Sequence, residues 1–120
     1  MAYINDEVYD QGLDYADTNG TRIDICSSEP ATQGAIAGVS LGNDTVNTGA
    51  TAAGATDGRR VIVPAITAGS VTATGTATHW ALSNGSSILV ATGALSASQA
   101  VTSGNTFTLD AVSITIRDAA

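Results

Sequence analysis

Residues 38–42 have the G-x-S-x-G spacing of a nucleophile elbow, in which the central serine attacks an acyl carbon. Ser40 would be that nucleophile, and Asp57 and His79 follow it in the serine, acid, histidine order that some hydrolases use. The elbow needs a strand before the serine and a helix after it, and residues 43–45 open no helical pattern. A chain with 13 glycines also produces this spacing by chance. We therefore interpret the motif as a glycine-flanked loop and predict that the protein is not an enzyme.

The single histidine and the single cysteine are the other candidates for metal or nucleophilic chemistry. His79 has no acidic or cysteine neighbour in the sequence, whereas a transition-metal site takes three or four ligands. Cys26 lies in a predicted strand with no nearby cation to lower its pKa. We predict a structural histidine at a strand surface, a small packing cysteine, no bound metal and no cofactor.

Acidic residues recur on one side of the N-terminal segment. Asp6, Asp10 and Asp14 are spaced i, i+4, i+8, and Asp17 follows three residues after Asp14. This face can be a solvated surface that keeps a low-charge protein soluble, or a surface that meets arginines or lysines of a partner. Calcium is a third interpretation, but a straight helix separates its carboxylates, whereas calcium needs a loop that wraps six or more oxygens.

The segment Asp57-Gly58-Arg59-Arg60 is the cationic cluster of the sequence. It closes a long loop just before a predicted strand. It is either a turn with solvated charges or a group that pairs with the acidic helix, in the same chain or in a neighbour. The candidate partner-binding residues are therefore Asp6, Asp10, Asp14, Asp17, Arg59 and Arg60.

Hydrophobic spacing predicts the elements that position these residues. An N-terminal helical arm, residues 1–20, begins after the N-cap Asn5 and stops at Gly20, which we expect in the left-handed conformation. At 3.6 residues per turn the acids lie on one half of this helix. The other half carries Ile4, Val8, Tyr9, Leu13, Tyr15 and Ala16, and we expect this helix to need packing to persist.

After Gly20 the period changes to two, which is typical of strands. Pro64 cannot donate to a ladder and should lie at an edge or a bulge, and a parity change predicts a bulge or bend near Gly75. Asn84-Gly85 predicts a hairpin, and the strand after it is apolar on both faces and should be central or covered. The expected strands are 22–26, 35–41, 61–66, 71–83, 88–90, 106–109 and 112–117, with a mobile loop near 42–58.

Seven or eight short strands at this spacing favour a mainly β fold. We predict one domain, residues 1–120, in which the helical arm precedes an antiparallel β-sandwich or jelly roll over residues 21–120.

The net charge of −7 is concentrated near the N-terminus, because residues 1–30 carry seven acids and one arginine. An acidic chain with four arginines and no lysine is a poor match for nucleic acid, whose phosphates need clustered cations. No apolar run reaches the ~20 residues of a membrane span, and the acidic segment 1–10 does not resemble a signal peptide. One cysteine permits no internal disulfide and fits synthesis in a reducing compartment. We expect neither nucleic acid nor a membrane as a partner.

Residues 61–109 contain no Asp, Glu, Lys or Arg. Within them, alternate threonines line one face of a predicted strand, opposite small apolar residues: Thr72, Thr74, Thr76 and Thr78. Soluble monomers normally guard exposed strands with charge. The sequence therefore predicts that another subunit covers much of this surface, as in a component of an assembly.

Several segments together resemble a family of small tailed-bacteriophage virion proteins. The resemblance spans most of the chain, although residues 31–56 carry little of it. The segments are Asp10-Gln11-Gly12-Leu13-Asp14-Tyr15, Ile25-Cys26-Ser27-Ser28-Glu29-Pro30, Asp57-Gly58-Arg59, Thr72-Ala73-Thr74-Gly75-Thr76-Ala77-Thr78-His79-Trp80-Ala81-Leu82 and Ile114-Thr115-Ile116-Arg117-Asp118.

The resemblance implies a capsid decoration or cement protein, which binds the major capsid protein on the outer surface of the assembled head and strengthens it. Such a protein would be made in the host cytoplasm and act as a homotrimer, with the N-terminal segment as its contact arm and strands within 61–117 forming the core and subunit contacts. The family brings no catalytic residues to carry over. A tail or fibre module that binds host glycans is the alternative, which the scarcity of aromatic residues disfavours.

Overall fold

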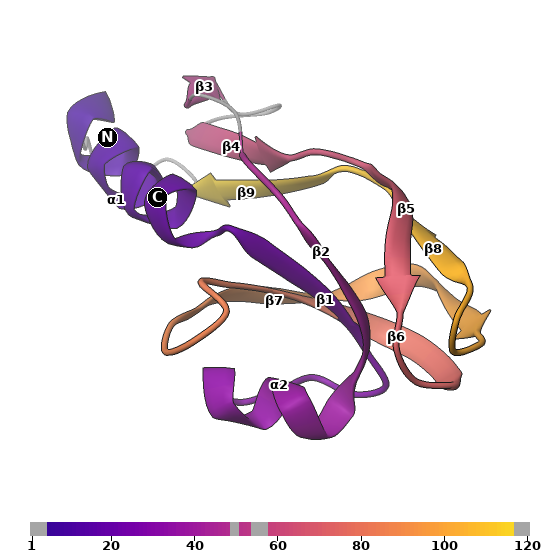
Figure 1. The fold of residues 1–120 in the computed structure, drawn as a ribbon. Coiled ribbons are helices and arrows are strands. Elements are labelled where there is room, and N and C mark those ends of the chain that lie inside the picture. The colour runs from indigo at the N-terminus through magenta and orange to yellow at the C-terminus, as the bar shows by residue number, and fades with distance from the viewer. Residues whose placement is uncertain (1–4, 49–50, 54–57, 117–120) are drawn as a thin grey trace.

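The computed structural model describes residues 5–48, 51–53 and 58–116, and shows a mainly β, antiparallel, sandwich-like fold with an N-terminal helix (Figure 1). This confirms the predicted fold class. The elements are α1 (Asp6–Asn19), β1 (Arg22–Cys26), α2 (Gln33–Val39), β2 (Ser40–Thr45), β3 (Ala52–Ala53), β4 (Arg59–Val63), β5 (Ile66–Val71), β6 (Gly75–Ser83), β7 (Leu89–Val101), β8 (Thr106–Leu109) and β9 (Val112–Ile116).

Two antiparallel sheets form the framework. The larger sheet has six strands in the order β7-β6-β1-β2-β5-β8, so β7 and β8 are its edges. The smaller sheet has three strands in the order β3-β4-β9. Figure 1 shows the larger sheet curling past β4 and β9, with α1 beside these two strands and α2 on the other side of β1.

The main core lies where the two sheets meet. Strands of the larger sheet supply most of it, Val63 of β4 joins them, and Val112 and Ile114 of β9 pack against it. Because Ile23 and Ile25 alternate with polar residues on β1, they both point to this core. The buried core residues are Ile23, Ile25, Leu41, Val46, Val63, Ile66, Val71, Ala77, Trp80, Leu82, Val101 and Phe107.

The helix α1 begins as the sequence predicts, but it buries a narrower stripe. The Asn5 side chain accepts a hydrogen bond of 2.8 Å from the backbone N–H of Glu7, as an N-cap does. The buried residues are Tyr9, Leu13 and Ala16. Val8 and Tyr15 lie on the predicted apolar half of the helix but remain 62% and 57% exposed. The reason is that, among the described residues, α1 packs mainly against two strands, β4 and β9, which lie along one side of it.

The expectation that Gly20 adopts a left-handed conformation is wrong, because its φ is −87°. Its backbone N–H donates to Ala16 O at 2.7 Å and so caps the helix. Steric crowding explains why this position is a glycine, since a Cβ here would lie 2.6 Å from Ala16 O and 2.8 Å from Leu82 Cδ2.

The strand expected over 35–41 is wrong, because most of this segment forms α2. Thr32 is the N-cap, and its hydroxyl accepts from the backbone N–H of Ala35 at 3.2 Å. The strand β2 then begins at Ser40 and continues to Thr45, and β3 covers Ala52–Ala53. The region expected as a loop, 42–58, therefore contains strand residues, while 49–50 and 54–57 lie outside the described residues.

Two expected strands are each divided. The exposed Pro64 lies between β4 and β5 rather than inside a ladder, where its missing N–H costs no hydrogen bond. The run 71–83 breaks between Val71 and Gly75, and a register shift follows between Ala77 and His79 in the β6–β7 pair. This irregularity reconciles the two parities of the run, because Ala77 and Trp80 are both buried.

The hairpin predicted at Asn84-Gly85 is confirmed. It joins β6 to β7, with Gly85 at a φ of +83°. The Asn84 carboxamide oxygen accepts from the backbone N–H groups of the three residues that close the loop: Ser86, Ser87 and Ile88. The strands predicted at 106–109 and 112–117 are β8 and β9, and Arg117 lies outside the described residues.

The strand after this hairpin is covered but not central, because β7 is an edge of the sheet. Its two faces meet different apolar groups. Val90 packs against the main core, and Leu89 packs against a second cluster formed by Cys26, Ile36 and Ala81 beneath α2. The start of β7 is therefore apolar on both faces because α2 covers its second face, and not because β7 is a central strand.

Candidate functional site

The acidic helix α1 contacts β4, the strand that begins with Arg59 and Arg60, through an ion pair within the same chain. Arg59 Nε lies 2.9 Å from Asp10 Oδ1, and Arg59 Nη2 lies 3.4 Å from Asp10 Oδ2. Both side chains are about three-quarters buried, with 24% of Arg59 and 28% of Asp10 exposed. Of the alternatives left open for Arg59, the pairing with the acidic helix of the same chain is the one that the structure contains.

The remaining candidate partner-binding residues fall into different environments. Asp17 accepts a hydrogen bond from the Thr48 hydroxyl, which ties the end of α1 to the segment after β2. Asp14 is exposed, and it forms no ion pair with another described residue. Arg60 has a buried Nε that finds no hydrogen-bond partner among the described residues. The side chain of Asp6 lies outside the described part of the structure.

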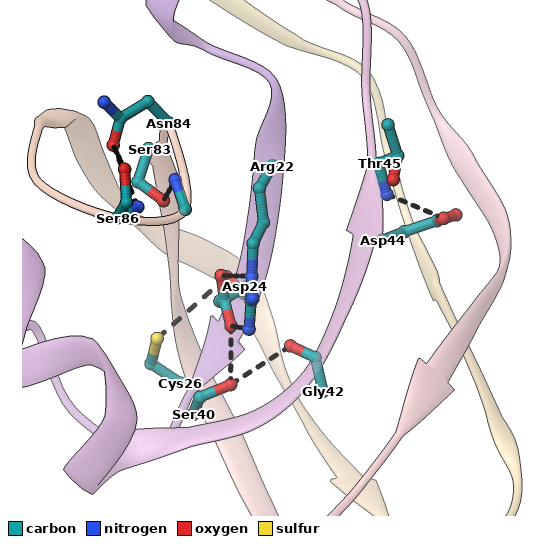
Figure 2. Close-up of polar contacts among 11 residues, drawn as sticks. Arg22, Asp24, Cys26, Ser40, Gly42, Asp44, Thr45, Ser83, Asn84 and Ser86 are labelled. Carbon is teal, nitrogen blue, oxygen red and sulfur yellow. Dashed lines mark hydrogen bonds and ion pairs between the residues drawn. The ribbon is translucent and has the colours of Figure 1, made fainter.

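A charged cluster that sequence reasoning missed lies inside the larger sheet (Figure 2). Asp24, on the central strand β1, is 0% exposed. Its carboxylate accepts from Arg22 Nε at 3.0 Å and Nη2 at 3.1 Å, and from the Ser40 hydroxyl at 2.7 Å. The hydrogen bonds to Asp24 raise the pKa of Arg22, its partial burial opposes them, and the charge of Asp24 adds to the increase.

The signal for this cluster was present in the sequence. Residues two apart on a strand share a face, so Arg22 and Asp24 had to lie side by side. The alternating pattern did not indicate that α2 covers that face of β1. Because α2 lies there, the Asp24 carboxylate on this face is buried rather than exposed to solvent. A fully paired and hydrogen-bonded carboxylate in such a place is a structural element rather than a free acid for catalysis.

Cys26 lies in the same region, two residues after Asp24. It is buried, and its Sγ is 4.0 Å from the Asp24 backbone oxygen. Burial raises the pKa of the Cys26 thiol to about 12, and the nearby charge of Asp24 contributes to the increase. A thiol with this pKa is not a nucleophile near neutral pH, in line with the interpretation of Cys26 as a packing residue.

Ser40 and His79, the two residues of the candidate triad that the structure describes, do not lie next to each other. Ser40 follows α2 and begins β2, which is the reverse of the strand-to-helix order of the elbow. Its hydroxyl donates to Asp24, while Cys26 pairs in the sheet with Ser40 on one side and His79 on the other. Two strand spacings of roughly 4.8 Å therefore separate the serine from the histidine. Asp57 lies outside the described residues.

His79 is half-buried on the surface of β6, as expected of a structural residue. Its Nδ1 lies 2.9 Å from the Thr78 hydroxyl, and its Nε2 lies 3.9 Å from Glu29 Oε2. Among the described residues, no three His, Cys, Asp or Glu side chains come close enough to hold a metal ion.

A cavity of about 640 Å³ lies between β7 and the connection from β8 to β9. Trp80 borders it, and the Gln99 side chain reaches across from β7 to donate to Thr108 O at 3.2 Å. Its other borders are residues 94–98 of β7 and residues 109–113. A second cavity of about 180 Å³ lies beside Arg22 and Asp24 under α2.

Comparison with known proteins provides no relative from which a function can be transferred. No protein-family model matches the sequence, and neither the curated proteins nor the solved structures contain a match. Neither helix in the described ranges is long and apolar enough to cross a membrane.

Proposed function

We propose that this protein is a structural component of a bacteriophage virion that decorates the head and stabilises it by binding the major capsid protein. The sequence segments that resemble small tailed-phage virion proteins suggest this role. The structural observation that supports it best is the edge strand β7. This strand is 13 residues long, and residues 89–101 contain no charged side chain.

An edge strand of this kind is a ready template for another chain. Its outer backbone N–H and C=O groups have no partner strand within the described sheet, and natural monomers guard such edges with lysines, prolines or short strands. The opposite edge, β8, is also uncharged. Burial of these edges between copies of the chain fits a homotrimer, with the acidic N-terminal helix left available for the capsid.

The mechanism would be bridging. A trimer that contacts several capsid subunits makes its contacts effectively intramolecular, so the complex opens only when several of them break together. Stabilisation by binding then follows mass action, because a ligand that prefers the intact shell shifts the equilibrium toward it.

Two measurements test the proposal. Head shells assembled without the protein should release DNA at a lower temperature than shells with it, and equal heat resistance would contradict the cement role. Light scattering should give the mass of a trimer, whereas a stable monomer at micromolar concentration would contradict the role of the uncharged edges. Antibody labelling of virions separates a head location from the alternative, a tail or fibre.

A further inference from the structure

The exposed side of α1 carries apolar side chains that the fold does not use. Val8 and Tyr15 are 62% and 57% exposed, and they are seven residues apart, or about 10 Å along the helix. A Cβ at Gly12, between them, would lie 3.3 Å from Ile116 Cδ1, so the half-buried Ile116 of β9 borders the same strip. We call these residues the helix patch: Val8, Gly12, Tyr15 and Ile116.

Two exposed carboxylates lie on the solvent side of α1, about 100° around the helix from the large apolar side chains of the helix patch. Glu7 and Asp14 each precede one of its large apolar residues, and they are also seven residues apart. Neither carboxylate forms an ion pair with another described residue, in contrast to Asp10, which Arg59 holds. The surface therefore combines two apolar anchors with a parallel line of two negative charges that have no partner in the described part of the fold.

A second copy of this chain is a poor occupant for such a surface. The sequence has four arginines and no lysine against eleven acids. Arg22 is bound to Asp24, and Arg59 is bound to α1 itself. Arg60 has a buried Nε, and Arg117 lies outside the described residues. Two copies that met through α1 would bring like charges together, which costs binding free energy.

We infer that the helix patch binds a segment of a different protein in which apolar residues are flanked by lysine or arginine. This follows the mode in which the apolar face of a helix packs into a complementary surface through anchors at i and i+7. Aromatic side chains such as Tyr15 dominate the free energy of such contacts, while charges at the rim set the rate and the salt dependence of association. The identity of the partner as the major capsid protein rests on the proposed function.

The test compares three variants for co-sedimentation with head shells made without the protein. The first is the double variant Val8→Thr/Tyr15→Ser, which removes both apolar anchors. The second is Glu7→Gln/Asp14→Asn, which removes the charges. The control is Ile62→Thr on β4, where the wild-type side chain is 40% exposed but lies outside the helix patch. Equal thermal melting temperatures must show that all variants fold.

We expect the first variant to weaken binding by about tenfold or more, and the control to bind like the wild type. The charge variant should bind a few-fold more weakly at low salt, with a smaller salt dependence than the wild type. If the wild type binds the shells and Val8→Thr/Tyr15→Ser binds equally well, the inference is wrong and the proposed function stands. If the wild type does not bind the shells, both are wrong.

Discussion

Two arginine–aspartate pairs of nearly equal geometry occupy different environments in this molecule. The Nε–Oδ1 distances are 3.0 Å for Arg22–Asp24 and 2.9 Å for Arg59–Asp10. Asp24 is fully buried and also accepts from Ser40, whereas Asp10 is partly exposed and Arg59 is the partner that joins it to β4. Because the distances are nearly equal, the comparison predicts that burial of the carboxylate decides what each pair contributes to stability.

The physical reason is desolvation. Burying a carboxylate in a sheet removes its water, and only good partners offset that loss, so removing one partner leaves an uncompensated charge. About a quarter of Arg59 and of Asp10 stays exposed, so water still reaches both charges and partly offsets the loss of either partner. The pair in the sheet should therefore be the sensitive one, and the pair between α1 and β4 the tolerant one.

Arg22→Met should produce the largest effect. It leaves the Asp24 carboxylate buried with the Ser40 hydroxyl as its remaining side-chain donor, and we expect the free energy of unfolding to fall by about 3–5 kcal/mol in urea titrations. The double variant Arg22→Met/Asp24→Leu is the control, because it removes both charges, and it should be more stable than the single variant. A loss below about 1 kcal/mol for Arg22→Met would contradict the contrast between the two pairs.

Ser40→Ala should cost about 2 kcal/mol, the usual contribution of a hydrogen bond to a charged group. The Ser40 hydroxyl donates to Asp24 at 2.7 Å, so the effect should vanish in the Asp24→Leu background. The measurement is again the midpoint of urea unfolding. A cost that persists unchanged without Asp24 would show that Ser40 acts through another contact.

The ionisation of the Cys26 thiol measures how unfavourable a further negative charge is in the buried region around Asp24. Its pKa is raised to about 12 in the folded state, while an unfolded cysteine titrates near 8.5. The unfolded thiol therefore loses its proton first, and this contribution to stability is complete below about pH 8.5 and decreases as the pH rises toward 12. We expect a loss of about 1.4 kcal/mol by pH 9.5 relative to Cys26→Ala, which lacks this titration. Parallel pH profiles for the two proteins would indicate that the thiol ionises freely in the fold.

Asp10→Asn should have the smallest effect, about 0.5 kcal/mol at low salt. Because about a quarter of each side chain in the Arg59–Asp10 pair is exposed, 1 M NaCl should lower this cost without abolishing it, since partly buried pairs are screened less than surface pairs. Thermal unfolding at the two salt concentrations measures this. If Asp10→Asn lowers the free energy of unfolding by more than about 2 kcal/mol, the Arg59–Asp10 pair behaves like the Arg22–Asp24 pair and the contrast between them is wrong.

The sequence predicted those elements that depend on residues close together in the chain, such as caps, alternating strands and turns. The N-cap Asn5, the alternation at 22–26 and the turn residues Asn84-Gly85 all appear where the sequence placed them. The helix α2 was missed because its Ala- and Gly-rich segment has a weak pattern, and its decisive feature is the Thr32 cap. The pattern also placed Val8 and Tyr15 on the apolar half of α1, although both are exposed, because it cannot tell how wide a neighbouring surface is.

The candidate site depended on tertiary contacts in the same way. The pairing of Arg59 with the acidic helix was one of the open alternatives, and the choice of Asp10 required the packing of α1 on β4. The buried environment of Asp24 required α2 above β1, which no pattern in residues 22–26 contains.

The order of strands in the larger sheet has a consequence for the time course of folding. The central strand β1 pairs on one side with β2, which follows it closely, and on the other side with β6, more than 50 residues later. Such non-local pairing slows folding, because a long loop must close before the contact forms. Until β6 arrives, Ile23 and Ile25 lack half of their sheet. The acidic segment just before β1 is then next in sequence to an apolar strand that lacks one of its neighbours, and charge beside such a strand opposes aggregation.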